Sequence, residues 1–346
     1  MKTFPKPRES NVTLKDIAAE LGVSLPTVSQ ILAPSSKRAN LFAPATREKV
    51  INAAREMGYR PNTAARSMVS GRFGSLTLVL GQRENSSILP PGLLSGIDDA
   101  LSEAGMHLVV AHLPDHRLTD AEVVPKLLNQ LASDGLLINY NAHIPRAMID
   151  LIERFQLPSI WINSKQEKAC VYPDDEGAAY ALTRKALEAG HRRVAYLNYT
   201  TGLHPASCHY SVLDRLAGYE RAMREAGLPS RIICEAQEVK PPDRITHVQT
   251  WLRAPEPPEA VVTYGKNECM AVLTAMDRMG LSCPKDLALY GINEERIQHF
   301  ELTLPTALLP EFEMGRKAVK LLLRHLKKPE TAIPSVAMPL HIEDLT

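Results

Sequence analysis

The stretch VTLKDIAAELGVSLPTVSQIL, residues 12–32, decides the fold of the N-terminal part of this chain. Apolar residues recur at helical spacing in two short runs, Ile17, Ala18 and Leu21 in the first and Val28, Ile31 and Leu32 in the second. Gly22 separates the runs at a turn where a Cβ atom would be costly, and Ser24 is suited to cap the second helix. The stretch predicts two short helices joined by a tight turn, a helix-turn-helix.

The second of these helices leaves four residues on its outer face near its N-terminal end. They are Leu25, Pro26, Ser29 and Gln30. Pro26 is tolerated there because the first helical turn has unpaired N–H groups in any case. In a helix-turn-helix this is the end that enters the major groove of DNA, although the same pattern taken alone also fits two helices of an ordinary bundle.

The residues that follow favour the DNA-binding interpretation. A third amphipathic helix is predicted over Pro44–Met57, and a short segment bounded by Pro61 and Gly71 comes after it. Over these residues the chain resembles the lactose/galactose-repressor (LacI/GalR) family of bacterial transcription factors. The matching residues are Val12–Asp16, Gly22–Ser24, Thr27–Ser29, Thr46–Val50, Gly58–Asn62 and Ala65–Arg66.

The resemblance and the exposed helix face together give the candidate DNA-binding residues. They are Thr13, Leu25, Pro26, Thr27, Ser29, Gln30, Thr46, Tyr59, Asn62, Ala65, Arg66 and Met68. The resemblance implies that residues 61–72 form a hinge, whose helix pairs with its copy across a dimer and inserts Met68 between base steps in the minor groove. So short a helix is marginal in water, and we expect it to fold on DNA. The alternative is a linker with no role in DNA binding.

The charge of the chain is unevenly distributed. Residues 1–72 carry a net charge of +7 and residues 73–346 a net charge of −6. A basic head of this kind is expected where one end of a molecule binds phosphates, although a solvated basic face without a partner has the same composition. The loop 33–43 is longer than the family usually carries, and its Lys37 and Arg38 favour phosphate contacts over a merely mobile surface loop.

Composition and motifs exclude several classes of protein. The N-terminus has no apolar signal-peptide core and no later run approaches membrane-spanning length, so we expect a cytoplasmic protein. The five cysteines are widely spaced and lack the spacing of metal ligands, which predicts reduced thiols and no metal. No HExxH, P-loop or GxSxG motif is present. We expect no cofactor and no enzymatic activity.

From Ser75 onward, apolar strands alternate with amphipathic helices, which is typical of parallel sheets flanked by helices. Strands are predicted at Leu76–Leu80, Leu108–Ala111, Gly135–Ile138, Ser159–Asn163, Val194–Leu197, Ala260–Thr263 and Leu287–Tyr290. Helices are predicted at Leu93–Ala104, Val123–Ala132, Ala147–Phe155, Ala178–Ala189, Ala217–Ala226 and Cys269–Met279. The fold class is therefore α/β after an N-terminal three-helix domain, and the two sets of strands indicate two similar lobes.

The resemblance extends into this region through Gly190–Tyr196, Arg215–Tyr219 and Met314–Val319. It implies a domain like the periplasmic binding proteins, in which the chain crosses three times between lobes. The expected parts are a helix-turn-helix domain at 1–60, a hinge at 61–72 and a ligand-sensing domain at 73–346. The expected lobes are an N-lobe of about 73–164 and 304–328 and a C-lobe of about 165–303 and 329–346.

A ligand is expected in the crevice at the carboxyl ends of the strands. The candidate effector-binding residues are Ser86, Ser87, Asn163, His209, Ser211, Arg215 and Lys266. By resemblance, Arg215 matches an arginine that grips hydroxyl or carboxylate oxygens, a role suited to its fork of donors. Lys266 stands where sugar-sensing members carry an aspartate that bridges two sugar hydroxyls.

This lysine puts a neutral sugar in doubt. Lys266, Arg215 and His209 together would make a basic floor suited to an anionic sugar derivative, such as a sugar acid or phosphate. The alternative is that Glu268 or Asp174 neutralises Lys266, which then contacts no ligand.

The sequence is thus interpreted as a homodimeric, ligand-responsive repressor of carbohydrate-related genes that binds a palindromic double-stranded DNA operator, with no membrane partner. Two other classes were weighed. A solute-binding transport protein would have a signal peptide and no basic head. A sugar-modifying enzyme would have a pair of catalytic carboxylates or a phosphate-binding glycine-rich loop, and neither is visible in the sequence.

Overall fold

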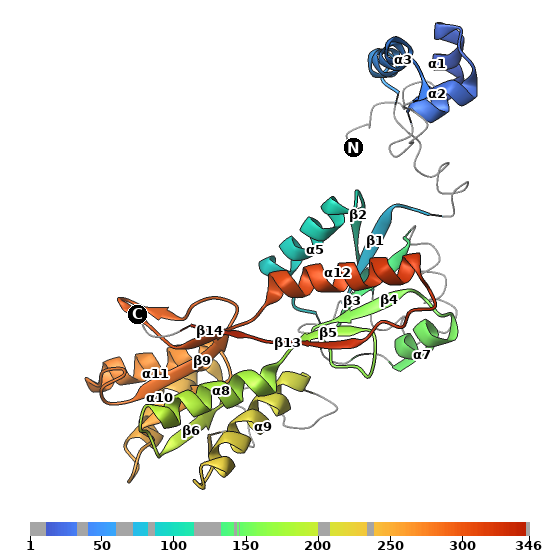
Figure 1. Ribbon diagram of the computed structural model, residues 1–346. Coiled ribbons are helices and arrows are strands. Elements are labelled where there is room, and N and C mark those ends of the chain that lie inside the picture. The colour runs from blue at the N-terminus through green and yellow to red at the C-terminus, as the bar shows by residue number, and fades with distance from the viewer. Residues whose placement is uncertain are drawn as a thin grey trace, which may run out of the picture. The chain divides into compact units, whose positions relative to one another are not determined.

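The computed structural model describes residues 12–32, 41–59, 72–81, 87–113, 133–141, 144, 146–199, 208–233 and 239–343 (Figure 1). The chain divides into two compact units, Met1–Phe73 and Gly74–Thr346. Each unit is described by itself.

The first unit is a bundle of three short helices, α1 (Leu14–Leu21), α2 (Leu25–Ile31) and α3 (Pro44–Glu56). Gly22 ends α1 with a φ of 63°, a left-handed conformation that glycine adopts without strain, and Ser24 caps α2. The helices pack around one apolar core, whose buried members are Ile17, Ala18, Val28, Ile31, Val50 and Ala54. The predicted helix-turn-helix and its third helix are confirmed.

The second unit contains two six-stranded sheets. The first has the order β13-β5-β4-β3-β1-β2, and all its strands are parallel. Its strands are β1 (Ser75–Gly81), β2 (His107–Leu113), β3 (Gly135–Asn139), β4 (Ser159–Ile162), β5 (Cys170–Pro173) and β13 (Ser335–Met338). The helices α5 (Pro91–Glu103) and α12 (Glu311–Lys327) cover one face, and α7 (Arg146–Arg154) lies on the other.

The second sheet has the order β14-β12-β9-β8-β6-β7, and only β14 runs antiparallel to its neighbour. Its strands are β6 (Val194–Leu197), β7 (Arg231–Ile233), β8 (Ala260–Thr263), β9 (Ala288–Asn293), β12 (Thr306–Leu308) and β14 (His341–Glu343). The helices α8 (Asp175–Glu188) and α9 (Tyr210–Glu225) cover one face, and α10 (Arg244–Leu252) and α11 (Lys266–Met279) cover the other. A 3₁₀ turn (Pro241–Asp243) precedes α10, and a small hairpin of β10 (Gln298–His299) and β11 (Leu302–Thr303) follows β9. The α/β fold class is confirmed.

The crossings between the sheets fall later than the predicted lobe boundaries. β5 belongs to the first sheet, so the first crossing comes after Pro173 and not near residue 164. β12 belongs to the second sheet and β13 to the first, so the later crossings follow Leu308 and Met338 and not residues 304 and 328. These three strands have three or four residues each, and the sheet that each one joins depends on long-range pairing.

Several elements also differ from the sequence prediction. The helix expected at Ala217–Ala226 begins at Tyr210 in the structure. Its first two turns were not predicted, because they mix polar and apolar residues. The strand β7 and the helix α10 were not predicted at all. The helix predicted at Val123–Ala132 lies outside the described residues. Among the residues that the structure describes, no helix is long and apolar enough to cross a membrane.

Candidate functional site

The N-terminal end of α2 is exposed in the structure. Ser24 accepts a hydrogen bond from the backbone N–H of Thr27 at 3.3 Å, which fixes the first turn of the helix. Beyond this cap, Pro26 and Ser29 are exposed, Gln30 is half-buried, and 38% of Leu25 remains accessible to solvent. The face predicted to meet DNA is therefore open to solvent at Pro26 and Ser29 and partly covered at Leu25 and Gln30.

Two of the candidate DNA-binding threonines use their side chains within the unit. The Thr13 hydroxyl donates to the Asp16 carboxylate at 2.7 Å and accepts from the Asp16 N–H, forming a capping box at α1. The Thr27 and Ser24 hydroxyls lie 2.8 Å apart. Tyr59 packs half-buried against the helical core, and Thr46 is half-buried on α3. The remaining candidates, Asn62, Ala65, Arg66 and Met68, lie outside the described residues.

The basic charge of the head comes from the segments that flank its helices. The described residues 12–32 and 41–59 contain four cations, Lys15, Arg47, Lys49 and Arg55, and four carboxylates, Asp16, Glu20, Glu48 and Glu56. The net charge of +7 of residues 1–72 therefore arises in 1–11, 33–40 and 60–72. The described part of the three-helix bundle therefore carries no net charge of its own.

In the second unit, a chain of hydrogen bonds joins the two sheets' loops through His209. Its Nε2 lies 2.9 Å from the backbone oxygen of Asn163, and its Nδ1 lies 2.8 Å from the hydroxyl of Ser211. Burial lowers the pKa of His209, so the ring is neutral near pH 7. Because a carbonyl oxygen only accepts, Nε2 carries the proton, and the Ser211 hydroxyl donates to Nδ1. The hydroxyl of Tyr264 lies 2.9 Å from Ser211 and completes the chain by donating to it.

Asn163 is the other centre of this network. It adopts a left-handed φ of 54° directly after β4. Its side-chain oxygen accepts a hydrogen bond from the Tyr210 hydroxyl at 3.1 Å, and its backbone oxygen accepts one from the Asn141 amide at 3.2 Å. Asn163, His209 and Ser211 are thus brought together, as the sequence prediction requires. Tyr210, Tyr264 and Asn141 were missed, and only Tyr210 carried a signal, as the neighbour of His209.

Ser87 lies at the end of the first sheet. Its hydroxyl accepts from the N–H of Gly81 at 2.7 Å and donates to the backbone oxygen of Asn139. It is therefore engaged with the strand ends of β1 and β3. Ser86 lies outside the described residues.

Arg215 is held by its own chain. Its Nε donates to Asp175 at 2.6 Å, its guanidinium also donates to the backbone oxygen of Tyr264, and it lies 4.5 Å from the centre of the Tyr264 ring. Both partners of the ion pair are buried, Arg215 at 7% and Asp175 at 1% exposure. Burial alone would lower the pKa of Arg215, but the Asp175 carboxylate more than offsets it and raises that pKa. The charge of Arg215 is thus already balanced.

Lys266, by contrast, is exposed on the first turn of α11, and the described part of the chain gives it no ion pair. Glu268 points inward, accepts the N–H of Tyr199 at 3.1 Å, and has a pKa raised by burial. Asp174 instead caps α8 through the N–H of Gly177. Neither carboxylate weighed as a neutralising partner pairs with Lys266. The predicted basic floor is corrected accordingly, because Arg215 is compensated and His209 is neutral.

The described residues contain no group of three or more histidine, cysteine, aspartate or glutamate side chains placed to hold a metal ion. The described cysteines are free thiols. The network around His209 therefore offers hydroxyl, amide and imidazole groups, and Lys266 is exposed at the start of α11.

Comparisons with known proteins identify both units. Residues 13–62 match a family model described as bacterial regulatory proteins, lacI family, and residues 183–343 match one described as a periplasmic binding protein-like domain. The N-terminal unit thus carries a lacI-family helix-turn-helix domain, and a periplasmic binding protein-like domain follows it. The resemblance seen in the sequence is confirmed, and relatives that match the chain are HTH-type transcriptional regulators and repressors.

Several relatives match this chain over nearly its full length. The transcriptional repressor CytR of Escherichia coli is 27% identical, over 93% of this chain and 92% of that protein. A complex of the transcriptional regulator CelR with cellobiose is 24% identical, with a TM-score of 0.62, over 97% of this chain and 99% of that one. A Lac repressor dimer bound to operator and the anti-inducer ONPF is 20% identical, with a TM-score of 0.75, over 97% of this chain and 98% of that one.

Proposed function

We propose that this regulator is a homodimeric repressor of carbohydrate-related genes that reads a palindromic operator through two copies of α2. Residues 1–60 are the proposed DNA-binding domain, 61–72 the hinge and 73–346 the ligand-sensing domain. The known structure of a Lac repressor dimer on its operator supports this assembly. The observation that carries the proposal is the exposed N-terminal end of α2, where Pro26 and Ser29 are exposed and 38% of Leu25 is accessible.

The hinge is proposed to act only on specific DNA. Insertion of Met68 between base steps requires a bent site, whereas phosphate attraction does not. Met68→Gly should therefore weaken binding to the selected operator far more than binding to random DNA of the same length. Affinities measured over a range of salt concentrations decide this, and an equal loss on both DNAs would leave residues 61–72 as a tether.

The proposed effector is a small sugar derivative that carries one anionic group. A carbohydrate is supported by the cellobiose complex of the related CelR. The anionic group is supported by Lys266, which is exposed and unpaired on the first turn of α11 while Arg215 is already neutralised. A carboxylate or phosphate there would gain a charge-assisted hydrogen bond and the favourable end of the helix dipole. The neighbouring hydroxyl and amide groups of Ser211, Tyr264 and Asn163 suit sugar hydroxyls.

Calorimetry with matched ligand pairs tests this assignment. Each pair consists of a neutral sugar and its uronic acid or phosphate ester, titrated into wild type, Lys266→Ala and Lys285→Ala. Lys285 is an exposed lysine that precedes β9, at the opposite end of the second sheet, so it controls for the loss of one charge. We expect the anionic partner to bind more tightly and to lose about tenfold or more in affinity on Lys266→Ala alone. Equal affinities for both partners, unchanged by Lys266→Ala, would overturn the anionic effector.

A further inference from the structure

A pocket of about 310 Å³ lies in the second sheet at the edge opposite the crevice. The crevice residues follow the carboxyl ends of the strands, whereas this pocket lies where strands begin. His191 precedes β6, Pro284 precedes β9 and Pro305 precedes β12. None of the candidate effector-binding residues lines it. The pocket is therefore separate from the site of the proposed function.

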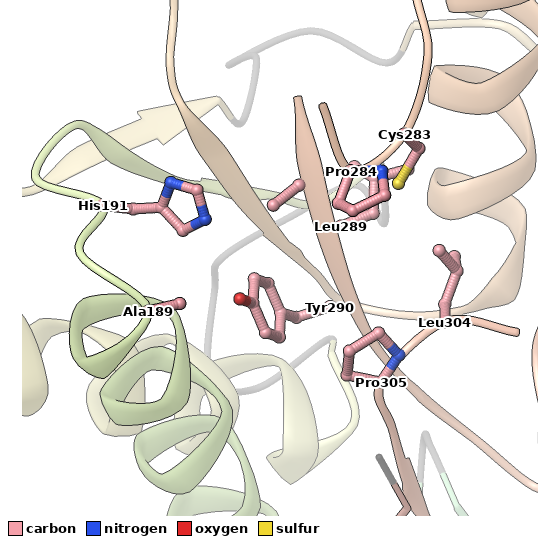
Figure 2. Close-up of a pocket in the computed structure, with 9 residues that line it drawn as sticks. Ala189, His191, Cys283, Pro284, Leu289, Tyr290, Leu304 and Pro305 are labelled. Carbon is pink, nitrogen blue, oxygen red and sulfur yellow. The ribbon is translucent and has the colours of Figure 1, made fainter. Parts of the chain in front are cut away.

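The walls of this pocket are mostly apolar and partly flat. Figure 2 shows the rings of Pro284, Pro305 and Tyr290 around the same space, with His191 across from the tyrosine and Ala189 beside it. No lysine, arginine, aspartate or glutamate is among the lining residues. A charged ligand would lose its hydration there without gaining an opposite charge, so the pocket favours uncharged molecules.

Two polar groups in the pocket, the Tyr290 hydroxyl and the His191 imidazole, form no side-chain hydrogen bond in the described part of the chain. Tyr290 is 95% buried, with a relative exposure of 5%, and no hydrogen bond of its hydroxyl is formed there. The imidazole of His191 likewise makes none. The tyrosine hydroxyl and the imidazole can each donate or accept a hydrogen bond, so a polar group that enters the pocket can bond to them.

We propose that this pocket binds a small, uncharged, planar aromatic or heteroaromatic molecule. Its ring would lie against Tyr290, Pro284 and Pro305, and one hydrogen-bonding group would meet the Tyr290 hydroxyl or the His191 ring. The volume fits this class, since a cavity of about 150 Å³ holds benzene, and twice that space holds a substituted ring or two fused rings. Burial raises the pKa of the Tyr290 hydroxyl. Burial also raises the pKa of the neighbouring Cys283 thiol, to about 11. Both groups therefore remain neutral.

The test uses the full chain with indole and p-cresol as neutral probes, and with benzoate and glucose as an anionic and a non-aromatic control. Binding is measured by calorimetry and by ligand-observed NMR. Wild type is expected to bind indole or p-cresol saturably, at one site per chain, and to bind benzoate and glucose at least about tenfold more weakly at this site. Tyr290→Phe keeps the ring and removes only the hydroxyl, and it should lower the affinity about three- to tenfold.

A second variant fills the space without entering the core. Ala189 is exposed at the C-cap of α8 and reaches the pocket, so Ala189→Leu should lower probe affinity about tenfold or more. Ala104 is its counterpart, an exposed C-cap alanine of α5 also followed by glycine, and Ala104→Leu should leave binding unchanged. Absence of saturable binding of both neutral probes to wild type would overturn the proposal. So would equal affinities of Ala189→Leu and wild type.

Discussion

The polar side chains of the two candidate functional regions differ in how far they are already bonded within the chain. On α2 the candidate DNA-reading residues fall within six consecutive positions, and Pro26 and Ser29 face solvent. In the crevice the candidate ligand-reading residues come from distant segments, and Asn163, His209, Ser211 and Arg215 are bound to one another or to nearby residues. The N-terminal end of α2 is thus exposed to a binding partner. A ligand in the crevice must instead replace hydrogen bonds that already exist.

This difference predicts that changes in the crevice cost stability and that changes on α2 cost only DNA affinity. The largest effect is expected for the buried ion pair. Asp175→Ala leaves the Arg215 charge buried without a partner and should lower the free energy of unfolding by roughly 3 to 5 kcal/mol. Denaturant unfolding of the full chain measures it. Asp150→Ala, which breaks the exposed pair with Arg146, is the control and should change it by less than about 0.5 kcal/mol. Similar values for both would show that the crevice is no more constrained than the surface.

A second prediction concerns the crossing between the sheets at the start of α12. Burial, Glu294 and Glu295 raise the pKa of Glu311 to about 7, above its ordinary value of 4.5. The folded chain therefore holds this proton more tightly than the unfolded chain, and stability should fall as the pH rises from 4.5 to 7, by roughly 1 to 3 kcal/mol. Glu311→Gln should remove that part of the pH dependence in melts between pH 5 and 8. Glu313→Gln, on the exposed side of the same turn, should retain it. Identical pH profiles for wild type and Glu311→Gln would contradict this prediction.

The third prediction concerns Gln30 on the DNA-binding face of α2. The Gln30 carboxamide can pair with a base edge, and such a pair contributes roughly 1 to 3 kcal/mol of discrimination. Gln30→Ala should weaken operator binding and relax sequence preference at one symmetric position, while the melting temperature stays unchanged. Binding to a panel of single-base operator variants measures this. An unchanged sequence preference would exclude Gln30 from base readout. A large loss of stability would show that Gln30 has a structural role, as is expected for the crevice residues.

The smallest effect is expected for the Tyr210 hydroxyl, which joins a loop of one sheet to a loop of the other. Tyr210→Phe removes the hydrogen bond to the side chain of Asn163 and should cost roughly 0.5 to 1.5 kcal/mol of unfolding free energy. Tyr180→Phe removes a hydroxyl that donates to Glu225 at the surface, and should cost less. If the surface variant is the more destabilised, the network around Asn163 does not hold the loops together.

The same contrast explains what the sequence could predict. The helix-turn-helix was predictable because Gly22 and Ser24 act on residues adjacent to them, through a left-handed turn and a cap. Most strands and helices between β1 and β9 were also predictable, because apolar strands alternate there with amphipathic helices, but β7 and α10 were not. The short strands β5, β12 and β13 were misassigned between lobes, because their sheet is chosen by long-range pairing.

The sequence indicated which residues come together in the crevice, but not which of their charges are neutralised by other residues. Asn163, His209 and Ser211 come together as expected, but the partner of Arg215 stands 40 positions away in the sequence, at Asp175. No local pattern indicates that pairing, and it converts a predicted free cation into a neutralised one. The pocket beside Tyr290 left no signal in the sequence, because a space between side chains depends on how distant loops pack.

Selection from a random DNA pool tests most directly whether this chain reads a palindromic DNA sequence through α2, and it requires no knowledge of the effector. The full chain is used to enrich a randomised duplex library over several rounds, and the products are sequenced. We predict enrichment of an inverted repeat whose two half-sites are read identically, with Gln30→Ala altering one symmetric position. A pool that stays random, or that enriches unpaired single half-sites, would contradict the account of a dimeric, sequence-specific repressor.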